Sequence, residues 1–155
     1  VKRRRVQMVY HKMNETDVET LMQLPYALIA SDAGIPAMDV GSPHPRAYGT
    51  NARVLGRYVR EHKTLTWEDA IRKMTSLPAQ KFHLEHRGML LPGYAADVVI
   101  FDPATVSDQA TFDHPHAYST GINYVVVNGV VVIDNGEHTG TRPGQILTGT
   151  GMKKQ

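Results

Sequence analysis

The sequence predicts an α/β first half followed by an all-β second half. Over residues 1–82, short apolar segments alternate with amphipathic segments of helical period, an order typical of parallel α/β units. Over residues 83–155, β-branched runs are separated by turn residues, and helical periodicity almost disappears. We therefore divide the chain into two domains, residues 1–82 and residues 83–155.

The first strand–helix unit is predicted from residue 6 onward. Residues 6–10 form an apolar run that indicates a short buried strand. Asn14 is a suitable N-cap for the helix that follows, because acidic residues occupy the next turn, where the helix dipole favours them. Pro25 cannot continue that helix, and residues 26–30 then predict a second buried strand.

The second unit contains a long loop and two further helices. Residues 35–49 are rich in proline and glycine, which indicates a loop. Residues 50–61 carry an apolar stripe at helical spacing. Thr66 begins a sequence that resembles a capping box and opens the next helix, and Pro78 marks a boundary or a further short turn.

The second half predicts a hairpin and neighbouring strands. Residues 97–101 form one apolar run that precedes a turn. Residues 122–127 and 130–133 are β-branched runs separated by the Asn-Gly pair at 128–129, which is the strongest short hairpin signal. A second turn follows at residues 134–136, so we expect a small antiparallel unit here.

Composition excludes several classes of protein. With 41% hydrophobic and 21% charged residues, the chain has a globular composition, and no apolar run is long enough to span a membrane. The net charge of +2 owes much to basic residues at the two ends, which argues against nucleic-acid binding. The absence of cysteine excludes thiolate sites and fits a cytoplasmic protein. Two strand–helix units cannot close a barrel, so we expect further barrel strands to be missing at the N-terminus.

Asp32 and Arg46 are the main candidates for chemistry. Asp32 follows the apolar run 26–30, and the C-terminal ends of parallel strands face the active site in α/β folds. A carboxylate there can bind a divalent metal or accept a proton, although it can also simply cap the loop. Arg46 lies in a loop stiffened by two prolines and suits bidentate binding of a carboxylate, or is a surface residue.

The histidines do not form a complete metal site. His11 ends the first predicted strand, and His44 lies in the proline loop. His114 and His116 form an H-x-H string, but no apolar strand precedes it, so we do not expect metal binding there. A zinc site needs three or four ligands, and this chain alone offers too few in one place.

Three ordered strings give the sequence its resemblance to a known family. Residues 11–18, 30–34 and 44–49 resemble the last two strand–loop units of N-acyl-D-amino-acid deacylases, which belong to the amidohydrolase superfamily. The combination Ser-Asp-Ala followed by His-Pro-Arg-x-Tyr-Gly is specific to this branch. The resemblance extends from Val6 to Gly144 and includes residues 53–59, 70–79 and 87–98.

The resemblance implies a fold and a set of roles. The fold would be the C-terminal end of a metal-dependent-hydrolase (β/α)8 TIM barrel followed by part of a small β-sandwich. Asp32, at the end of barrel strand 8, would be the general acid/base and could also touch the metal. Arg46 would bind the α-carboxylate of the substrate, with Ser31 and His44 as further substrate-binding residues. The family binds zinc through an H-x-H after strand 1 and through middle strands, segments that this chain lacks; His11 is a weaker metal candidate.

The leading hypothesis is a C-terminal fragment of a zinc-dependent hydrolase of N-acyl-D-amino acids. It would be inactive alone, would bind no zinc by itself and would need the missing N-terminal part of the barrel as its partner. One alternative is a non-catalytic domain that associates with a partner or with itself, because missing strands expose apolar faces. A third hypothesis is a cyclic amidase of the same superfamily, similar to dihydroorotase or hydantoinase.

Overall fold

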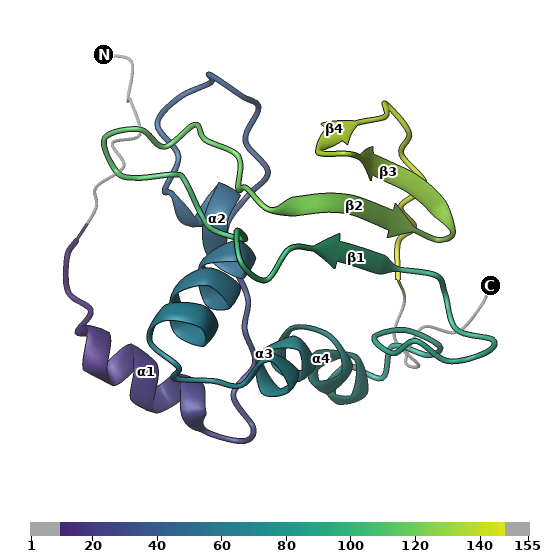
Figure 1. The fold of residues 1–155 in the computed structure, drawn as a ribbon, viewed down its shortest axis with the longest axis horizontal. Coiled ribbons are helices and arrows are strands. Elements are labelled where there is room, and N and C mark those ends of the chain that lie inside the picture. The colour runs from purple at the N-terminus through teal and green to yellow at the C-terminus, as the bar shows by residue number, and fades with distance from the viewer. Residues whose placement is uncertain (1–9, 148–155) are drawn as a thin grey trace, which may run out of the picture.

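The computed structural model describes residues 10–147. Helices occupy the first part of this range and strands the second, and the loop between β1 and β2 returns to the helices (Figure 1). None of the helices in the described range combines the length and the hydrophobicity needed to cross a membrane. In chain order the elements are α1 (Glu15–Gln23), α2 (Arg46–Arg53), the π-helix η1 (Val54–Glu61), α3 (Trp67–Met74), α4 (Ser76–Lys81), β1 (Val98–Phe101), β2 (Ile122–Val127), β3 (Val130–Asp134) and β4 (Glu137–His138).

The helix starts follow the predicted capping residues. The side chain of Asn14 accepts a hydrogen bond from Thr16 N at 2.8 Å, and that of Thr66 accepts one from Asp69 N at 3.2 Å. Each bond satisfies a backbone donor that has no partner inside the helix, so both predicted caps are confirmed. The predicted helix 50–61 begins earlier, at Arg46, because Pro45 already has helical backbone angles and loses no hydrogen bond at a helix start.

The four strands form one antiparallel sheet in the order β1-β2-β3-β4. Asn128 (φ 49°) and Gly129 (φ 80°) both adopt left-handed backbone angles between β2 and β3. This is the geometry that an Asn-Gly hairpin turn requires, so the predicted hairpin is confirmed. The described residues 10–147 contain this single sheet, without the second layer that a sandwich needs.

The predicted strand at residues 26–30 is not formed. Ile29 N donates its hydrogen bond to Lys73 O of α3 at 3.2 Å, whereas a parallel strand would bond to a neighbouring strand. A strand needs a neighbouring strand, and within the described residues no strand pairs with residues 26–30. This prediction was therefore wrong for the chain by itself. The predicted strand 6–10 lies outside the described residues except for Tyr10.

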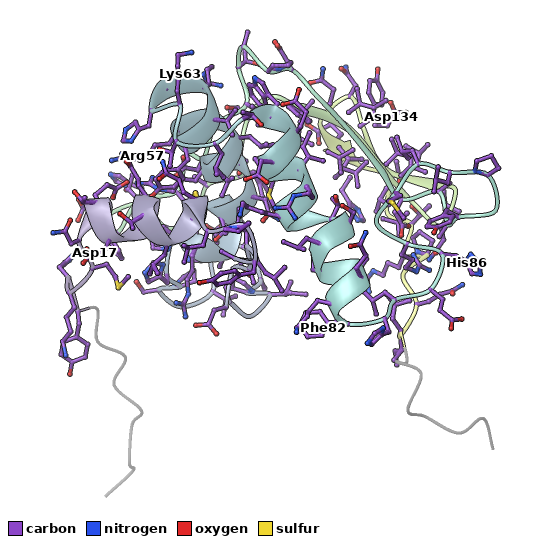
Figure 2. The ribbon with its side chains drawn as sticks, turned by 90° about the horizontal axis from the view of Figure 1, so that it is seen from below. Asp17, Arg57, Lys63, Phe82, His86 and Asp134 are labelled. Carbon is purple, nitrogen blue, oxygen red and sulfur yellow. The ribbon has the colours of Figure 1, made fainter. Side chains whose placement is uncertain are left out.

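The core joins the helices to the base of the sheet. Val106, in the loop after β1, is fully buried against η1. A Cβ on Gly56 would lie 2.6 Å from Val106 O, so only glycine permits this approach. Figure 2 shows the resulting arrangement, with Asp17 and Arg57 at the helical end and Asp134 at the end that carries the sheet. The other buried members of this core are Ala52, Val54, Leu55, Tyr58, Val59, Leu65 and Ala70.

Candidate functional site

The two main sequence candidates meet in an ion pair. Nη2 of Arg46 lies 3.0 Å from Oδ2 of Asp32. Asp32 lies in the loop before α2 with a left-handed φ of 48°, and Arg46 is the first residue of α2. The Asp32 side chain is 87% exposed and that of Arg46 is 44% exposed. Both charged groups are therefore accessible to a ligand.

The exposure of this pair decides its chemistry. Ion pairs at the surface typically stabilise a protein by less than about 1 kcal/mol. A carboxylate ligand can therefore replace Asp32 on the guanidinium of Arg46 at small cost, because arginine binds carboxylates through two parallel hydrogen bonds. Asp32 would then be free to accept a proton from a neighbouring group.

His44 lies directly against the backbone of Arg46. Its Nδ1 accepts a hydrogen bond from Arg46 N at 3.1 Å, so the ring proton of the neutral form is on Nε2. Burial lowers the pKa of His44 below its ordinary value of 6.5, and the charge of Arg46 lowers it further. The ring is therefore neutral at pH 7 and can donate a hydrogen bond from Nε2.

The other predicted residues are placed less directly. Phe112 makes edge contacts with His44 and with His11, each with ring centroids 5.0 Å apart, so the two histidines lie on the same aromatic side chain. The hydroxyl of Ser31 accepts a hydrogen bond from Ala33 N at 3.4 Å and shapes the turn that contains Asp32. Its own proton remains available for a ligand.

An apolar cavity of about 690 Å³ lies beside Arg46. Its walls come from α1, from the segment before Asp32, from α2 and η1, and from the β1–β2 loop (residues 102–121), while His44 and Arg46 belong to its polar part. Its volume is in the range of small-molecule sites. Representative apolar lining residues are Val18, Met22, Leu28, Val54 and Phe112.

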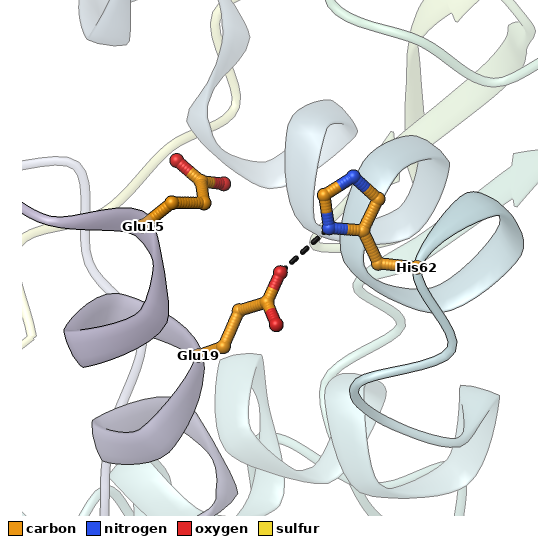
Figure 3. A group of neighbouring side chains, drawn as sticks. All are labelled: Glu15, Glu19 and His62. Atoms are coloured by element: carbon orange, nitrogen blue, oxygen red, sulfur yellow. Dashed lines mark hydrogen bonds and ion pairs between the residues drawn. The ribbon is translucent and has the colours of Figure 1, made fainter.

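The residues around Asp32 do not fit a zinc site. Within residues 10–147, the group of three possible ligands with closely spaced atoms is Glu15, Glu19 and His62, and their atoms lie within 4.8 Å of one another (Figure 3). Nδ1 of His62 lies 2.6 Å from Oε1 of Glu19, and Glu15 pairs with Arg57 at 3.1 Å. These side chains join α1 to η1 and already have protein partners. Sequence reasoning missed them, although the spacing of the two glutamates places both on one helix face.

A family model and curated relatives match this chain. The model described as "Amidohydrolase family" matches residues 3–133. The D-aminoacylase of Alcaligenes xylosoxydans xylosoxydans is 44% identical over 142 residues, which cover 92% of this chain and 29% of the relative. The N-acyl-D-glutamate deacylase of the same organism is 47% identical over 139 residues, covering 90% and 28%. The chain thus spans less than a third of the length of these relatives.

A solved structure shows the same similarity. The N-acyl-D-glutamate deacylase from Bordetella bronchiseptica, in complex with zinc and a phosphonate inhibitor that mimics the tetrahedral intermediate, is 46% identical. The two structures superpose with a TM-score of 0.77, over 87% of this chain and 28% of the other. At this identity the fold of the matched segment is shared.

Proposed function

Because the chain belongs to the N-acyl-D-amino-acid deacylase branch of the amidohydrolase family, we propose that it supplies the C-terminal part of an enzyme that hydrolyses N-acyl-D-amino acids. The observation that carries this proposal is the 3.0 Å pair of Asp32 and Arg46, an acid/base group beside a carboxylate binder. In the complete enzyme, residues 1–82 would be the last strand–helix units of a TIM barrel. Residues 83–155 would be part of a small β-sandwich.

The roles follow from the charges of the pair. Arg46 exchanges Asp32 for the α-carboxylate of the substrate and thereby fixes which face of the chiral carbon points to the site. The freed Asp32 takes a proton from the attacking water as the water oxygen bonds to the amide carbon. Asp32 returns this proton to the nitrogen as the C–N bond breaks. One water is consumed, and the products are a carboxylic acid and a free D-amino acid.

Two neighbours assist binding in this proposal. Nδ1 of His44 accepts the hydrogen bond from Arg46 N, so the neutral ring carries its proton on Nε2. Nε2 can therefore donate a hydrogen bond to an oxygen of the substrate. The hydroxyl of Ser31 accepts from Ala33 N and can donate its own proton in the same way. Both groups suit the binding of an acyl or carboxylate oxygen.

Zinc enters this proposal only through residues that other segments would supply. Asp32 is a single candidate donor in an ion pair with Arg46, and one donor does not hold zinc. We therefore derive no step through the metal from this chain.

The apolar cavity beside Arg46 and the exposed side chains of Met13, Leu21 and Tyr26 support a partner segment that packs against the helices.

The decisive experiment combines the chain with the N-terminal segment of the Alcaligenes D-aminoacylase that it does not match. We expect hydrolysis of N-acetyl-D-amino acids, but not of the L-enantiomers, only in the mixture. Asp32→Asn should reduce kcat by about 10²–10⁴-fold, the usual contribution of general acid–base catalysis. Asp134→Asn, at the end of β3, is the matched control and should act like the wild type.

Substitution of Arg46 separates the competing functions. Arg46→Ala should raise KM for substrates with a free α-carboxylate and leave their methyl esters unaffected, with Arg142→Ala as the control. Equal effects on esters and acids would favour a cyclic amidase, whose substrate ring lacks that group. Turnover with stoichiometric zinc in the chain alone would reject the fragment proposal. A stable homodimer by light scattering, with no activity in the mixture, would favour a non-catalytic association domain.

A further inference from the structure

We propose that His116 is a positioning residue that holds the arginine loop, residues 41–48, which include the first turn of α2, in the form that presents Arg46 to a substrate carboxylate; this inference rests on the proposed function. His116 belongs to the β1–β2 loop of the second half. In Figure 1 this green loop runs beside the blue segment that leads into α2. The two segments are far apart in the sequence, so only the fold brings them together.

One imidazole contacts both ends of the arginine loop. Nε2 of His116 lies 3.0 Å from the carbonyl oxygen of Gly41, and Nδ1 lies 3.0 Å from the hydroxyl of Tyr48. A carbonyl oxygen can only accept, so Nε2 must carry a proton. In the neutral ring Nδ1 then accepts a hydrogen bond from the Tyr48 hydroxyl. The imidazole thus closes the loop at the two positions that flank His44 and Arg46.

The Tyr48 hydroxyl is suited to this role. Desolvation raises the pKa of Tyr48 above its ordinary value, and the neighbouring Tyr118 and Asp39 raise it further. The hydroxyl therefore keeps its proton at neutral pH and can donate a hydrogen bond to Nδ1 of His116. Tyr118 also makes an edge contact with the Tyr48 ring at a centroid distance of 5.7 Å, so the same loop contacts the side chain twice.

Further contacts from the β1–β2 loop support the same arrangement. The hydroxyl of Ser119 donates to the carbonyl oxygen of Tyr48 at 3.0 Å. Phe112 contacts the His44 ring, which in turn accepts a hydrogen bond from Arg46 N. The loop therefore contacts residues on both sides of Arg46. The backbone position of Arg46 sets which positions its guanidinium can reach.

The consequence is that the second half of the chain contributes to substrate binding. Loss of the His116 bridge removes the bonds to Gly41 O and to the Tyr48 hydroxyl and lets the residues before α2 shift relative to the helix. Binding energy from a well-placed arginine is then lost in the ground state and the transition state alike, which raises KM more than it lowers kcat. Asp32 lies in another segment, before the residues that His116 bonds, so we expect its acid/base role to change less than binding by Arg46.

Two variants of His116 test the bridge. His116→Leu removes both hydrogen bonds, whereas His116→Gln keeps one donor and one acceptor, separated by one carbon as in the imidazole, and should restore them. His114→Leu is the matched control, since the backbone of His114, rather than its ring, bonds Thr111. Hydrogen exchange of the 155-residue chain should be at least tenfold faster over residues 42–48 in His116→Leu and unchanged in the other two.

The reconstituted enzyme supplies the functional readout. We expect His116→Leu to raise KM for N-acyl-D-amino acids by about tenfold with kcat within twofold of the wild type, and His116→Gln to restore KM. A wild-type mixture without hydrolysis would reject the proposed function on which the inference rests. If the wild type is active but KM is the same in His116→Leu, or if exchange over residues 42–48 does not change, the positioning role is wrong. The positioning role would also be wrong if His116→Gln lost as much kcat and stability as His116→Leu.

Discussion

Nη1 of Arg53 lies 2.9 Å from Oδ2 of Asp108 and joins α2 to the β1–β2 loop. The Asp108 side chain is only 16% exposed. Burial lowers the pKa of Arg53, but the hydrogen bond and the charge of Asp108 outweigh this effect and leave the pKa raised. A Cβ on Gly49 would lie 2.7 Å from Asp108 Cβ, so α2 and the loop pack too closely there for a side chain. The loop that carries His116 is thus fixed to the helices by a charged hydrogen bond.

Substitution of Asp108 should weaken the connection between the two halves. We expect Asp108→Ala to lower the free energy of unfolding by about 1–3 kcal/mol, because a hydrogen bond between charged groups is lost and Arg53 stays partly buried. Urea denaturation measures the effect. The exposed Asp113 of the same loop is the control, and Asp113→Ala should change stability by less than about 0.5 kcal/mol. Equal stabilities of the two variants would contradict the role given to the pair.

Elements set by neighbouring residues could be predicted from the sequence. Asn14 and Thr66 cap helices because a side-chain oxygen reaches a backbone donor two or three residues later. The pair Asn128 and Gly129 forms the hairpin turn because both residues tolerate left-handed angles. The sequence indicates Asp32 and Arg46 as the main candidates, and the family resemblance implies that both belong to one site. Their ion pair was not predicted, because it joins a loop to the start of α2.

Features that depend on distant partners could not be predicted. The apolar run 26–30 has the composition of a strand, yet backbone pairing needs a neighbour, and Ile29 bonds to Lys73 instead. His62 and Glu19 show no local signal for their 2.6 Å contact, since it arises from the packing of η1 on α1. The bridge of His116 likewise arises because the β1–β2 loop folds back on the arginine loop.

Glu15 gives the chain a defined acid dependence. Burial tends to raise the pKa of Glu15, but the hydrogen bond from Tyr58 and the charges of Arg57 and Arg53 outweigh it, so the pKa is lowered from 4.5. The stability that Glu15 contributes to the folded chain is therefore present above pH 4.5 and is lost as the pH falls through its lower pKa in the folded chain. We expect Glu15→Gln to destabilise the chain at pH 7 by up to about 1 kcal/mol.

The comparison across pH makes this prediction specific. In urea denaturation, the difference between Glu15→Gln and the wild type should shrink towards zero as the carboxylate of the folded wild type becomes protonated below pH 4.5. Glu85→Gln, an exposed residue in a turn, should show no difference at either pH. A constant difference from pH 7 to pH 3 would mean that the glutamate acts through packing rather than charge.

His44 should make the stability of the chain depend on pH near neutrality. Its pKa in the folded chain is below 6.5, mainly through burial and then through Arg46, so the unfolded chain binds more protons between the two values. Stability therefore decreases as the pH falls from about 7 through the folded pKa. NMR titration of the ring should give a value below 6.5, and His44→Gln should reduce the slope, whereas His83→Gln should not. A titration above 6.5 would contradict this account.

Lys73 tests how the segment before Asp32 is held. Its side chain is completely buried, its Nζ donates to the carbonyl oxygen of Leu24, and it lies 3.6 Å from Oδ2 of Asp69. Lys73→Met keeps most of the volume but leaves the carbonyl without its donor, so we expect a loss of about 1–3 kcal/mol in urea denaturation. Lys81→Met, on the exposed side of α4, should have little effect.

A double-mutant cycle separates the two partners of this lysine. If Lys73 acts mainly through its charge on Asp69, then Lys73→Met and Asp69→Asn together should cost clearly less than the sum of the single changes. If the bond to Leu24 dominates, the two effects should add, because a backbone carbonyl is unaffected by Asp69→Asn. The structure favours the second result, since Asp69 also accepts two hydrogen bonds from Arg72, at 3.0 and 2.9 Å, and does not depend on Lys73. A strong coupling would show instead that Lys73 acts mainly through its ion pair with Asp69, which lies within α3, rather than through its bond to the end of α1.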